Sequence, residues 1–201
     1  ASLDLQRKQE VLPFIRQLHE HLRIPVLYVS HGLTEILQLA DRVILMKEGH
    51  VAGTGLLNEV CTTLDFRAQL GPHRIGAILN ARVIHHDLQY GLTQLDFNNH
   101  ALFVPIQSVP VGQALRVHIF SNDVSLVLAQ TVVPTSILNI LKASVVEGRE
   151  IDQSSVEVVL DIGTPLVASI TRKSLMSLGL KPGQLVFAHI KTVALNEEFV
   201  E

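Results

Sequence analysis

The stretch that decides the first part of the fold reads PVLYVSHGLTEILQLADRV, residues 25–43. Its apolar run over residues 26–30 lacks polar alternation, which is typical of a parallel strand covered on both faces. Leu33, Ile36 and Leu37 then follow at helical spacing. His31 therefore lies between a predicted strand and a predicted helix, at the edge where open α/β sheets bind ligands. On position alone, a histidine that merely ends the strand explains it at least as well.

The elements around this stretch extend the α/β pattern. Apolar residues at helical spacing predict a helix over residues 5–23, in which Pro13 should produce a kink. Residues 43–46 predict a second buried strand, and Glu48-Gly49 predicts a turn into a returning strand over 50–55. A further helix is expected over 56–70. Two such strands cannot cover themselves, so we expect most of the sheet to lie elsewhere and the chain to start in the middle of a domain.

Composition restricts the class of protein. The 201 residues are 47% hydrophobic, with no run of the roughly 18 apolar residues that a spanning helix needs. The single cysteine, Cys61, and the absence of a signal peptide favour a reducing cytoplasm. A net charge of −3 with 4% aromatic residues argues against nucleic-acid binding. The ten histidines are scattered, with one adjacent pair at His85-His86, so no metal site is predicted.

From Gly76 onward the apolar period changes from helical to alternating. Turn residues recur at Asn98-Asn99, at Gly112 and at Lys181-Pro182-Gly183. The alternating positions are Leu95 and Phe97; Leu102, Val104 and Ile106; Leu115, Val117 and Ile119; and Val156, Val158, Leu160 and Ile162. Short strands at this spacing predict a small barrel or sandwich.

This alternating region contains an internal repeat. Ala81 and Val83 correspond to Ala143 and Val145, 62 residues later; Leu95-Asp96-Phe97 to Leu160-Asp161-Ile162, 65 later; and Gly112-Gln113 to Gly183-Gln184, 71 later. A helical turn over residues 172–178, present only in the second copy, accounts for part of the growing offset. Chance similarity among valine-rich strands is the alternative. Two true copies could bury one another's apolar faces.

The order of motifs in the first part resembles the ABC ATPases. The matching residues are Ala1-Ser2-Leu3-Asp4, residues 25–31, Glu35-Ile36, Ala40-Asp41-Arg42-Val43, Gly49 and Gly53. The resemblance makes His31 the catalytic switch histidine that contacts the γ-phosphate. It places Ser2 and Asp4 in the D-loop, at the interface of an ATPase homodimer.

The sequence lacks other motifs of that family. No phosphate-binding loop, no Leu-Ser-Gly-Gly-Gln signature and no acidic Walker B strand occur in it. We therefore expect ATP and Mg²⁺ to bind only in a full-length subunit, and this chain alone to be inactive. The resemblance implies membrane permease subunits as partners and a cytoplasmic, peripheral position on the inner face of the membrane.

The second copy of the repeat resembles the molybdate-binding Mop domain. The matching residues are 135–139, 168–171, Ser174, 178–183 and 188–191, and residues 116–126 resemble the segment that precedes Mop in molybdate importer ATPases. The resemblance implies a molybdate or tungstate site with Ser136, Lys173 and Ser174 as the candidates. Leu138 stands where the family has an arginine, which puts the affinity in doubt. Capping by Ser136 and an ordinary surface role for Lys173 explain these residues equally well.

These observations lead to one predicted architecture. We expect an α/β remnant of an ABC ATPase domain over residues 1–72, followed by an all-β small barrel of Mop or OB-like type. The barrel would have a first half at 76–134 and a Mop-like second half at 135–196. Its parent would couple ATP hydrolysis to molybdate uptake, while the barrel senses oxyanion or makes subunit contacts. The alternatives are an importer ATPase for sulfate, polyamine or sugar, a stand-alone oxyanion-binding module, and a nucleic-acid-binding barrel.

Overall fold

The structure is a computed structural model that describes residues 11–12, 14–15, 18–19, 21–60, 75–128 and 134–191. Its contacts divide the chain into two compact units. We call residues 1–60 unit 1 and residues 61–200 unit 2. Among the described residues, no helix combines the length and the apolar character that crossing a bilayer requires.

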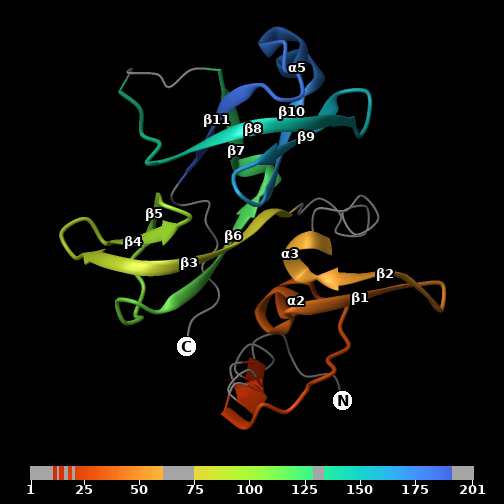
Figure 1. The fold of residues 1–201 in the computed structure, drawn as a ribbon, viewed down its shortest axis with the longest axis vertical. Coiled ribbons are helices and arrows are strands. Elements are labelled where there is room, and N and C mark those ends of the chain that lie inside the picture. Colours follow the sequence, from red (N-terminus) through yellow and green to blue (C-terminus); the bar gives the residue numbers. More distant parts are fainter. Residues whose placement is uncertain are drawn as a thin grey trace. The chain divides into compact units, whose positions relative to one another are not determined.

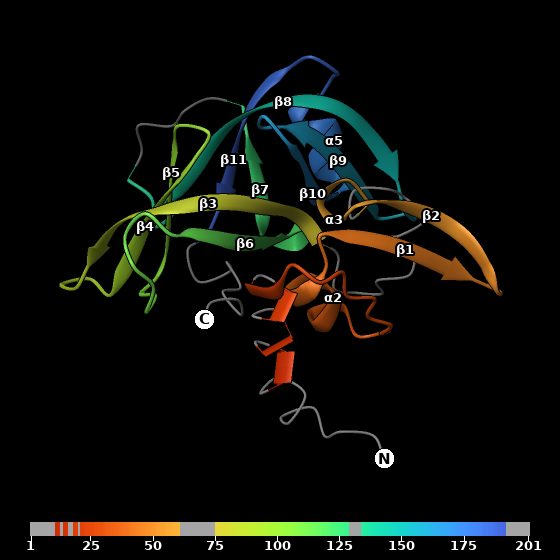
Figure 2. The same ribbon diagram turned by 60° about the horizontal axis from the view of Figure 1, so that its bottom comes forward.

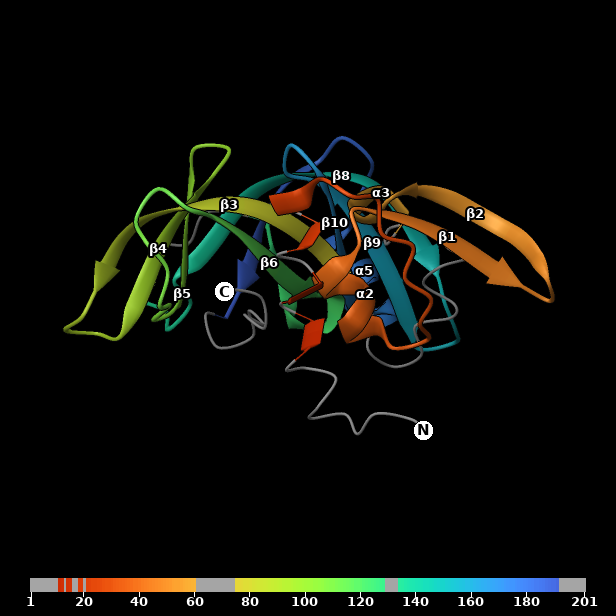
Figure 3. The same ribbon diagram turned by 90° about the horizontal axis from the view of Figure 1, so that it is seen from below.

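Unit 1 contains helices and one hairpin. The described residues between 11 and 22 are helical, which agrees with that part of the predicted helix. Residues 5–10 and Pro13 lie outside the described residues, so the kink stays a prediction. The later elements are α2 (Leu33–Leu39), β1 (Arg42–Lys47), β2 (His50–Leu56) and α3 (Leu57–Val60). Strands β1 and β2 form the antiparallel ribbon seen in Figure 3, joined by Glu48 and Gly49 at φ values of 50° and 79°. Two positive φ values match the twist of a two-residue hairpin. The predicted hairpin and the helix after His31 are confirmed. The prediction that residues 43–46 form a buried strand is wrong, since Ile44 and Met46 in β1 are 56% and 55% exposed.

The strand predicted over residues 26–30 is wrong. These residues have no regular secondary structure, and Leu27 and Val29 are 85% and 89% exposed. An apolar run of this kind becomes a strand when neighbouring strands take up its backbone groups. The described residues of unit 1 offer only the two-stranded hairpin, and neither of its strands pairs with this run. The α/β interpretation of residues 1–72 therefore remains a proposal.

Unit 2 consists mainly of β-strands. A four-stranded sheet has the order β5-β4-β3-β6, and a five-stranded sheet has the order β10-β9-β8-β11-β7. The elements are β3 (Ile75–Asp87), β4 (Leu92–Phe97), β5 (His100–Pro105), β6 (Ala114–Phe120), η1 (Ser121–Asp123), β7 (Val124–Val127), β8 (Asn139–Glu150), β9 (Ser155–Asp161), β10 (Pro165–Thr171), α5 (Arg172–Leu178) and β11 (Leu185–Ile190). Figure 1 shows α5 beyond the end of β10, and Figure 2 shows β3 and β6 side by side.

One hydrophobic core joins the two sheets. Alternate residues of the strands point into it, and Leu79, Leu95 and Leu141 have no exposed surface. Most of the alternating positions read from the sequence belong to this core, which confirms the predicted β region. Ile106 is the exception, since it lies just after β5 and is 44% exposed.

The strand pairings of the two halves repeat each other. Strands β5-β4-β3-β6 of the first half have the same order and antiparallel sense as β10-β9-β8-β11 of the second. The β3–β4 register shifts between Val83 and His85, and the β8–β9 register shifts between Val145 and Glu147, 62 residues later. A bulge at the same position in both halves confirms the internal repeat. Strand β7 comes from the first half but pairs with β11.

The turns before β6 and β11 also repeat. The Gly112 N–H donates to the Val83 carbonyl at 2.8 Å, and the Gly183 N–H donates to the Val145 carbonyl at 2.7 Å. Both glycines have positive φ, 90° and 80°, where a side chain would be strained. The Gly-Gln pairs recognised in the sequence are therefore markers of the same turn, used twice.

The two halves pack together through equivalent strands. The side chain of Asn139 in β8 bonds the backbone of Phe103 in β5, accepting from its N–H at 2.7 Å and donating to its carbonyl at 3.0 Å. Conversely, Gly76 in β3 lies so close to β10 that a Cβ atom there would be 2.7 Å from the Val167 carbonyl oxygen. The first strand of each half thus contacts the third strand of the other half. Neither half has a complete core alone.

Candidate functional site

The sequence singled out residues in both units, and their positions in the structure differ. Ser2 and Asp4 lie outside the described residues, so their D-loop assignment stays a prediction. His31 is exposed, at a bend directly before α2. A single exposed imidazole does not form a nucleotide pocket, and the described residues by themselves do not account for ATP binding.

The bend at His31 is held by hydrogen bonds from its neighbours. The Gly32 N–H donates to the Ser30 hydroxyl oxygen at 2.9 Å, and the Ser30 hydroxyl donates to Glu35. The Tyr28 hydroxyl donates to the same Glu35 oxygen at 3.0 Å. Glu35 is 7% exposed. The sequence comparison included Glu35 only as part of a motif, because nothing in the pattern shows that its carboxylate turns back toward residue 30.

Two of the predicted oxyanion residues line one open pocket in unit 2. Lys173 and Ser174, both on α5, contribute to a pocket of about 520 Å³. The other lining residues come from η1, β7, β10 and α5: Asn122, Val124, Ser125, Leu126, Ser169, Ile170, Ser177 and Leu178. Among the described residues no carboxylate lines it. A lysine, several hydroxyls and an amide are donors suited to a small oxyanion.

Ser174 also has a structural role. Thr171 caps α5, its hydroxyl oxygen accepting from the Ser174 N–H at 3.0 Å, and the two hydroxyls lie 2.8 Å apart. Because the Thr171 oxygen already accepts a bond, its own hydrogen can point to the Ser174 oxygen. The Ser174 hydrogen can then donate to a ligand. Capping and ligand binding are therefore compatible at this residue.

Ser136 is not part of this pocket. It is exposed at a bend before β8, where the Ile137 N–H donates to the Thr135 hydroxyl at 3.2 Å. The structure thus brings Lys173 and Ser174 together and leaves Ser136 apart. Sequence reasoning missed Ser125, Ser169 and Ser177, since they come from three different elements and no spacing relates them. Leu138, at the position of the family's arginine, is 49% exposed.

Three histidines of unit 2, His86, His118 and His189, have structural environments. His86 Nδ1 lies 2.9 Å from the Thr93 hydroxyl, and its Nε2 lies 2.7 Å from the Val109 carbonyl oxygen. His118 and His189, 71 residues apart, occupy equivalent buried positions in β6 and β11. Burial, and then the Arg116 charge, lower the pKa of His118 to about 3, and burial lowers the pKa of His189. Both are therefore neutral at pH 7. Within the described ranges no cluster of metal-ligating side chains occurs.

Comparison with known proteins gives matches over both units. Residues 135–195 match the TOBE domain. The chain is 41% identical over 199 residues to the molybdenum import ATP-binding protein ModC of Methylococcus capsulatus, covering 98% of this chain and 55% of that protein. It is 40% identical over 197 residues to the protein of the same name in Escherichia coli K12, with the same coverage of 98% and 55%. The chain thus spans about half the length of the curated relatives it matches.

One solved structure is similar in fold. The cytoplasmic molybdate-binding protein ModG, with molybdate bound, superposes with a TM-score of 0.51 at 19% identity. The superposition covers 59% of this chain and 92% of ModG. At that identity the likeness concerns the fold alone.

Proposed function

Because the chain belongs to the family of the molybdenum import ATP-binding proteins, we propose that it is the carboxy-terminal part of an ATPase subunit that couples ATP hydrolysis to molybdate uptake. The observation that carries the proposal is the 41% identity over 98% of the chain. An identity that extends through both units supports an origin of both from the same kind of subunit. The match of 135–195 to the TOBE domain agrees with this.

In this proposal unit 1 supplies part of an ABC ATPase domain. His31, exposed before α2, is the switch histidine, and Ser2 and Asp4 belong to the D-loop at the interface with a second ATPase subunit. ATP and Mg²⁺ bind mainly to parts of the subunit other than this chain, which lacks a phosphate-binding loop. The subunit works at the cytoplasmic face of the membrane with permease subunits. The chain by itself does not hydrolyse ATP.

Unit 2 is the small β barrel of OB-like type, with an oxyanion site in the pocket beside α5. Lys173 supplies the cation and Ser174 a hydroxyl donor. Ser136 lies in the exposed segment before β8, outside the lining of this pocket. A tetrahedral dianion requires several donors and a positive charge, and the pocket contains both. Helix α5, which carries Lys173 and Ser174, belongs to the second half, so the proposal places the site there.

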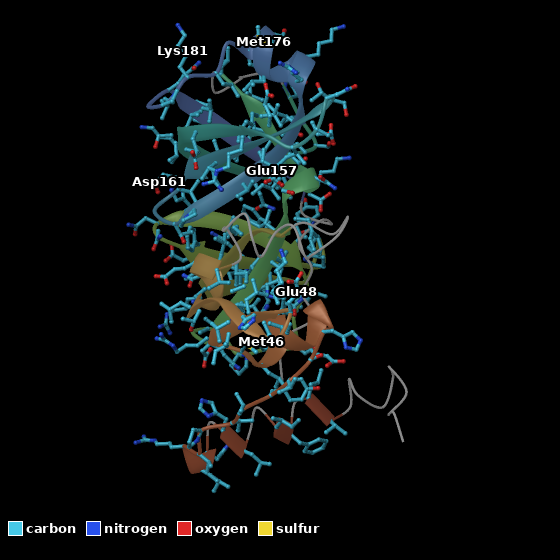
Figure 4. All side chains as sticks on the ribbon, turned by 90° about the vertical axis from the view of Figure 1, so that its right-hand side faces the viewer. Met46, Glu48, Glu157, Asp161, Met176 and Lys181 are labelled. Atoms are coloured by element: carbon cyan, nitrogen blue, oxygen red, sulfur yellow. The ribbon has the colours of Figure 1, made fainter. Side chains whose placement is uncertain are left out.

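Titration calorimetry on the chain tests the oxyanion site. Molybdate and tungstate should release heat, and sulfate should bind more weakly. Lys173→Gln should weaken molybdate binding about tenfold or more, because Lys173 is the one cation among the described residues that line the pocket. Lys181→Gln is the matched control. Lys181 lies at the same end of unit 2 as Met176 of α5 (Figure 4), but it does not line the pocket. Equal weakening in both variants, or no heat with molybdate, would refute the site.

The ATPase role is tested in the complete subunit assembled with its permease. His31→Ala should reduce ATP turnover about a hundredfold or more, because phosphoryl transfer depends on positioned groups around the phosphate. Molybdate uptake should fall in parallel. The isolated chain should show only background hydrolysis. Unchanged turnover in His31→Ala would contradict the proposed function of unit 1.

A further inference from the structure

The segment that carries His31 is anchored to one buried carboxylate. Glu35 lies in the first turn of α2 and is 7% exposed. Its Oε2 accepts the hydroxyl hydrogens of both Tyr28, at 3.0 Å, and Ser30. Hydrogen bonds to an ionised acceptor are stronger than those between neutral groups. The carboxylate therefore fixes two residues of a segment that has no strand partner in the described structure.

The Ser30 hydroxyl links Glu35 to Gly32, the residue on the other side of His31. Its oxygen accepts from the Gly32 N–H at 2.9 Å while its own hydrogen is donated to Glu35. Ser30 and Gly32 are the two chain neighbours of His31, so the backbone is held on both sides of it. The imidazole itself stays exposed.

Two further contacts fix the position of Gly32: the Glu35 side chain and the Ile36 N–H. A Cβ atom at this position would be 3.1 Å from Cδ and 3.2 Å from Oε1 of Glu35, so the carboxylate packs directly on the glycine. The Gly32 carbonyl accepts from the Ile36 N–H at 3.2 Å and thereby starts α2. The bend is thus tied to the helix as well as to the carboxylate.

We propose that Glu35 is a positioning residue for His31, acting through Ser30 and Gly32, in the ATPase reaction. This inference rests on the proposed function, in which His31 faces the terminal phosphate. Rate is sensitive to position, since a displacement of about 1 Å at a reacting group costs about a hundredfold. Glu35 acts on the bend and not on the substrate, so its loss should lower kcat and leave the nucleotide KM nearly unchanged.

The kinetic experiment uses the complete subunit with its permease. Glu35→Ala should lower kcat about tenfold to a hundredfold with KM within about twofold, and Glu35→Gln, which keeps one acceptor oxygen, should lower it less. Glu48→Gln is the matched control, because Glu48 is an exposed glutamate in the hairpin turn of the same unit (Figure 4). In the double variant with His31→Ala, Glu35→Ala should cause no further loss, since it acts through that histidine.

The outcomes separate this inference from the proposed function. If His31→Ala leaves kcat unchanged, the proposed function fails, and this inference fails with it. If His31→Ala abolishes turnover while Glu35→Ala stays within about twofold of the wild type, only the positioning role is overturned. A loss in Glu35→Ala that adds fully to that of His31→Ala, or one that appears in KM, also overturns it.

A second experiment needs no nucleotide. Amide exchange of the chain, followed by NMR, should show Gly32 protected in the wild type because its N–H is bonded to Ser30. Ser30→Ala and Glu35→Ala should each speed the exchange of this amide about tenfold, whereas Glu48→Gln should leave it unchanged. Wild-type exchange at Gly32 in both variants would show that the carboxylate does not hold the bend.

Discussion

Unit 1 and unit 2 both contain apolar sequence runs, but the two units bury them very differently. Val26, Leu27 and Val29 are 49%, 85% and 89% exposed, whereas Leu95 and Leu160 in unit 2 are fully buried. The difference lies in available partners. Every described strand of unit 2 has a neighbour and contributes to one core, partly because the repeat supplies a second copy of β3, β4, β5 and β6. Apolar periodicity therefore predicts which residues need burial. Whether they are buried depends on a complementary surface elsewhere in the fold.

The largest expected difference between the units is in amide exchange. Amides in the central strands β3 and β8 should be protected at least about a thousandfold more than those of residues 26–30, because central strands open only with the whole domain. Hydrogen exchange followed by mass spectrometry measures this directly. Comparable protection in both regions would remove the contrast between the units.

A glycine in each unit gives a matched pair of substitutions. Gly76→Ala should destabilise unit 2 by about 3 to 4 kcal/mol, because the new Cβ would meet the Val167 carbonyl oxygen at 2.7 Å and the Ser121 nitrogen at 3.0 Å. Gly53→Ala in β2 has nothing within 4 Å and should change stability by less than about 0.5 kcal/mol. Urea unfolding, followed by the NMR signals of each unit, measures both. Equal effects would show that β3 and β10 do not approach closely.

The link between the two halves of unit 2 is tested at Asn139. Asn139→Ala should cost about 3 kcal/mol, because it removes two hydrogen bonds and leaves the Phe103 N–H and carbonyl without these partners. Asn80→Ala, at an exposed position of β3, is the control and should cost little. Urea midpoints of the two variants decide the point. A loss at Asn139 no greater than that at Asn80 would argue against the interlocked arrangement.

The smallest effect concerns pH. The pKa of His118 falls from an ordinary 6.5 to about 3 on folding, so the folded state favours the neutral ring. Its contribution to stability is complete above pH 6.5 and is lost progressively as the pH falls toward 3. Between pH 6.5 and 5 unit 2 should lose up to about 2 kcal/mol from this residue.

Thermal unfolding of the wild type and of His118→Gln across this range measures the linkage. The variant should have a shallower pH dependence whatever its absolute stability, because glutamine does not titrate. Identical slopes would show that His118 does not control the acid response. His189, whose pKa is also lowered, is expected to account for part of the slope that remains.

The sequence predicted local features better than it predicted the site. The helix after His31, the Glu48-Gly49 turn and the strands of unit 2 follow from periodicity and turn residues, which act over a few positions. The pocket beside α5 could be predicted only in part. Lys173 and Ser174 are neighbours in the chain, but Ser125 and Ser169 join them because β7 and β10 line the same pocket as α5. Ser136 was grouped with them by resemblance, and the structure leaves it outside the pocket.

The repeat, helix α2, the Glu48-Gly49 and Asn98-Asn99 turns with their positive φ values, and the resemblance to molybdate importer ATPases follow from the sequence alone. These depend on side-chain pattern and backbone preference, which are properties of short segments. Three features become visible in the folded chain alone: residues 26–30 form no strand, Glu35 turns back to Ser30, and Asn139 joins the two halves. Each of these depends on which distant groups come within hydrogen-bonding distance, and a linear pattern does not contain that information.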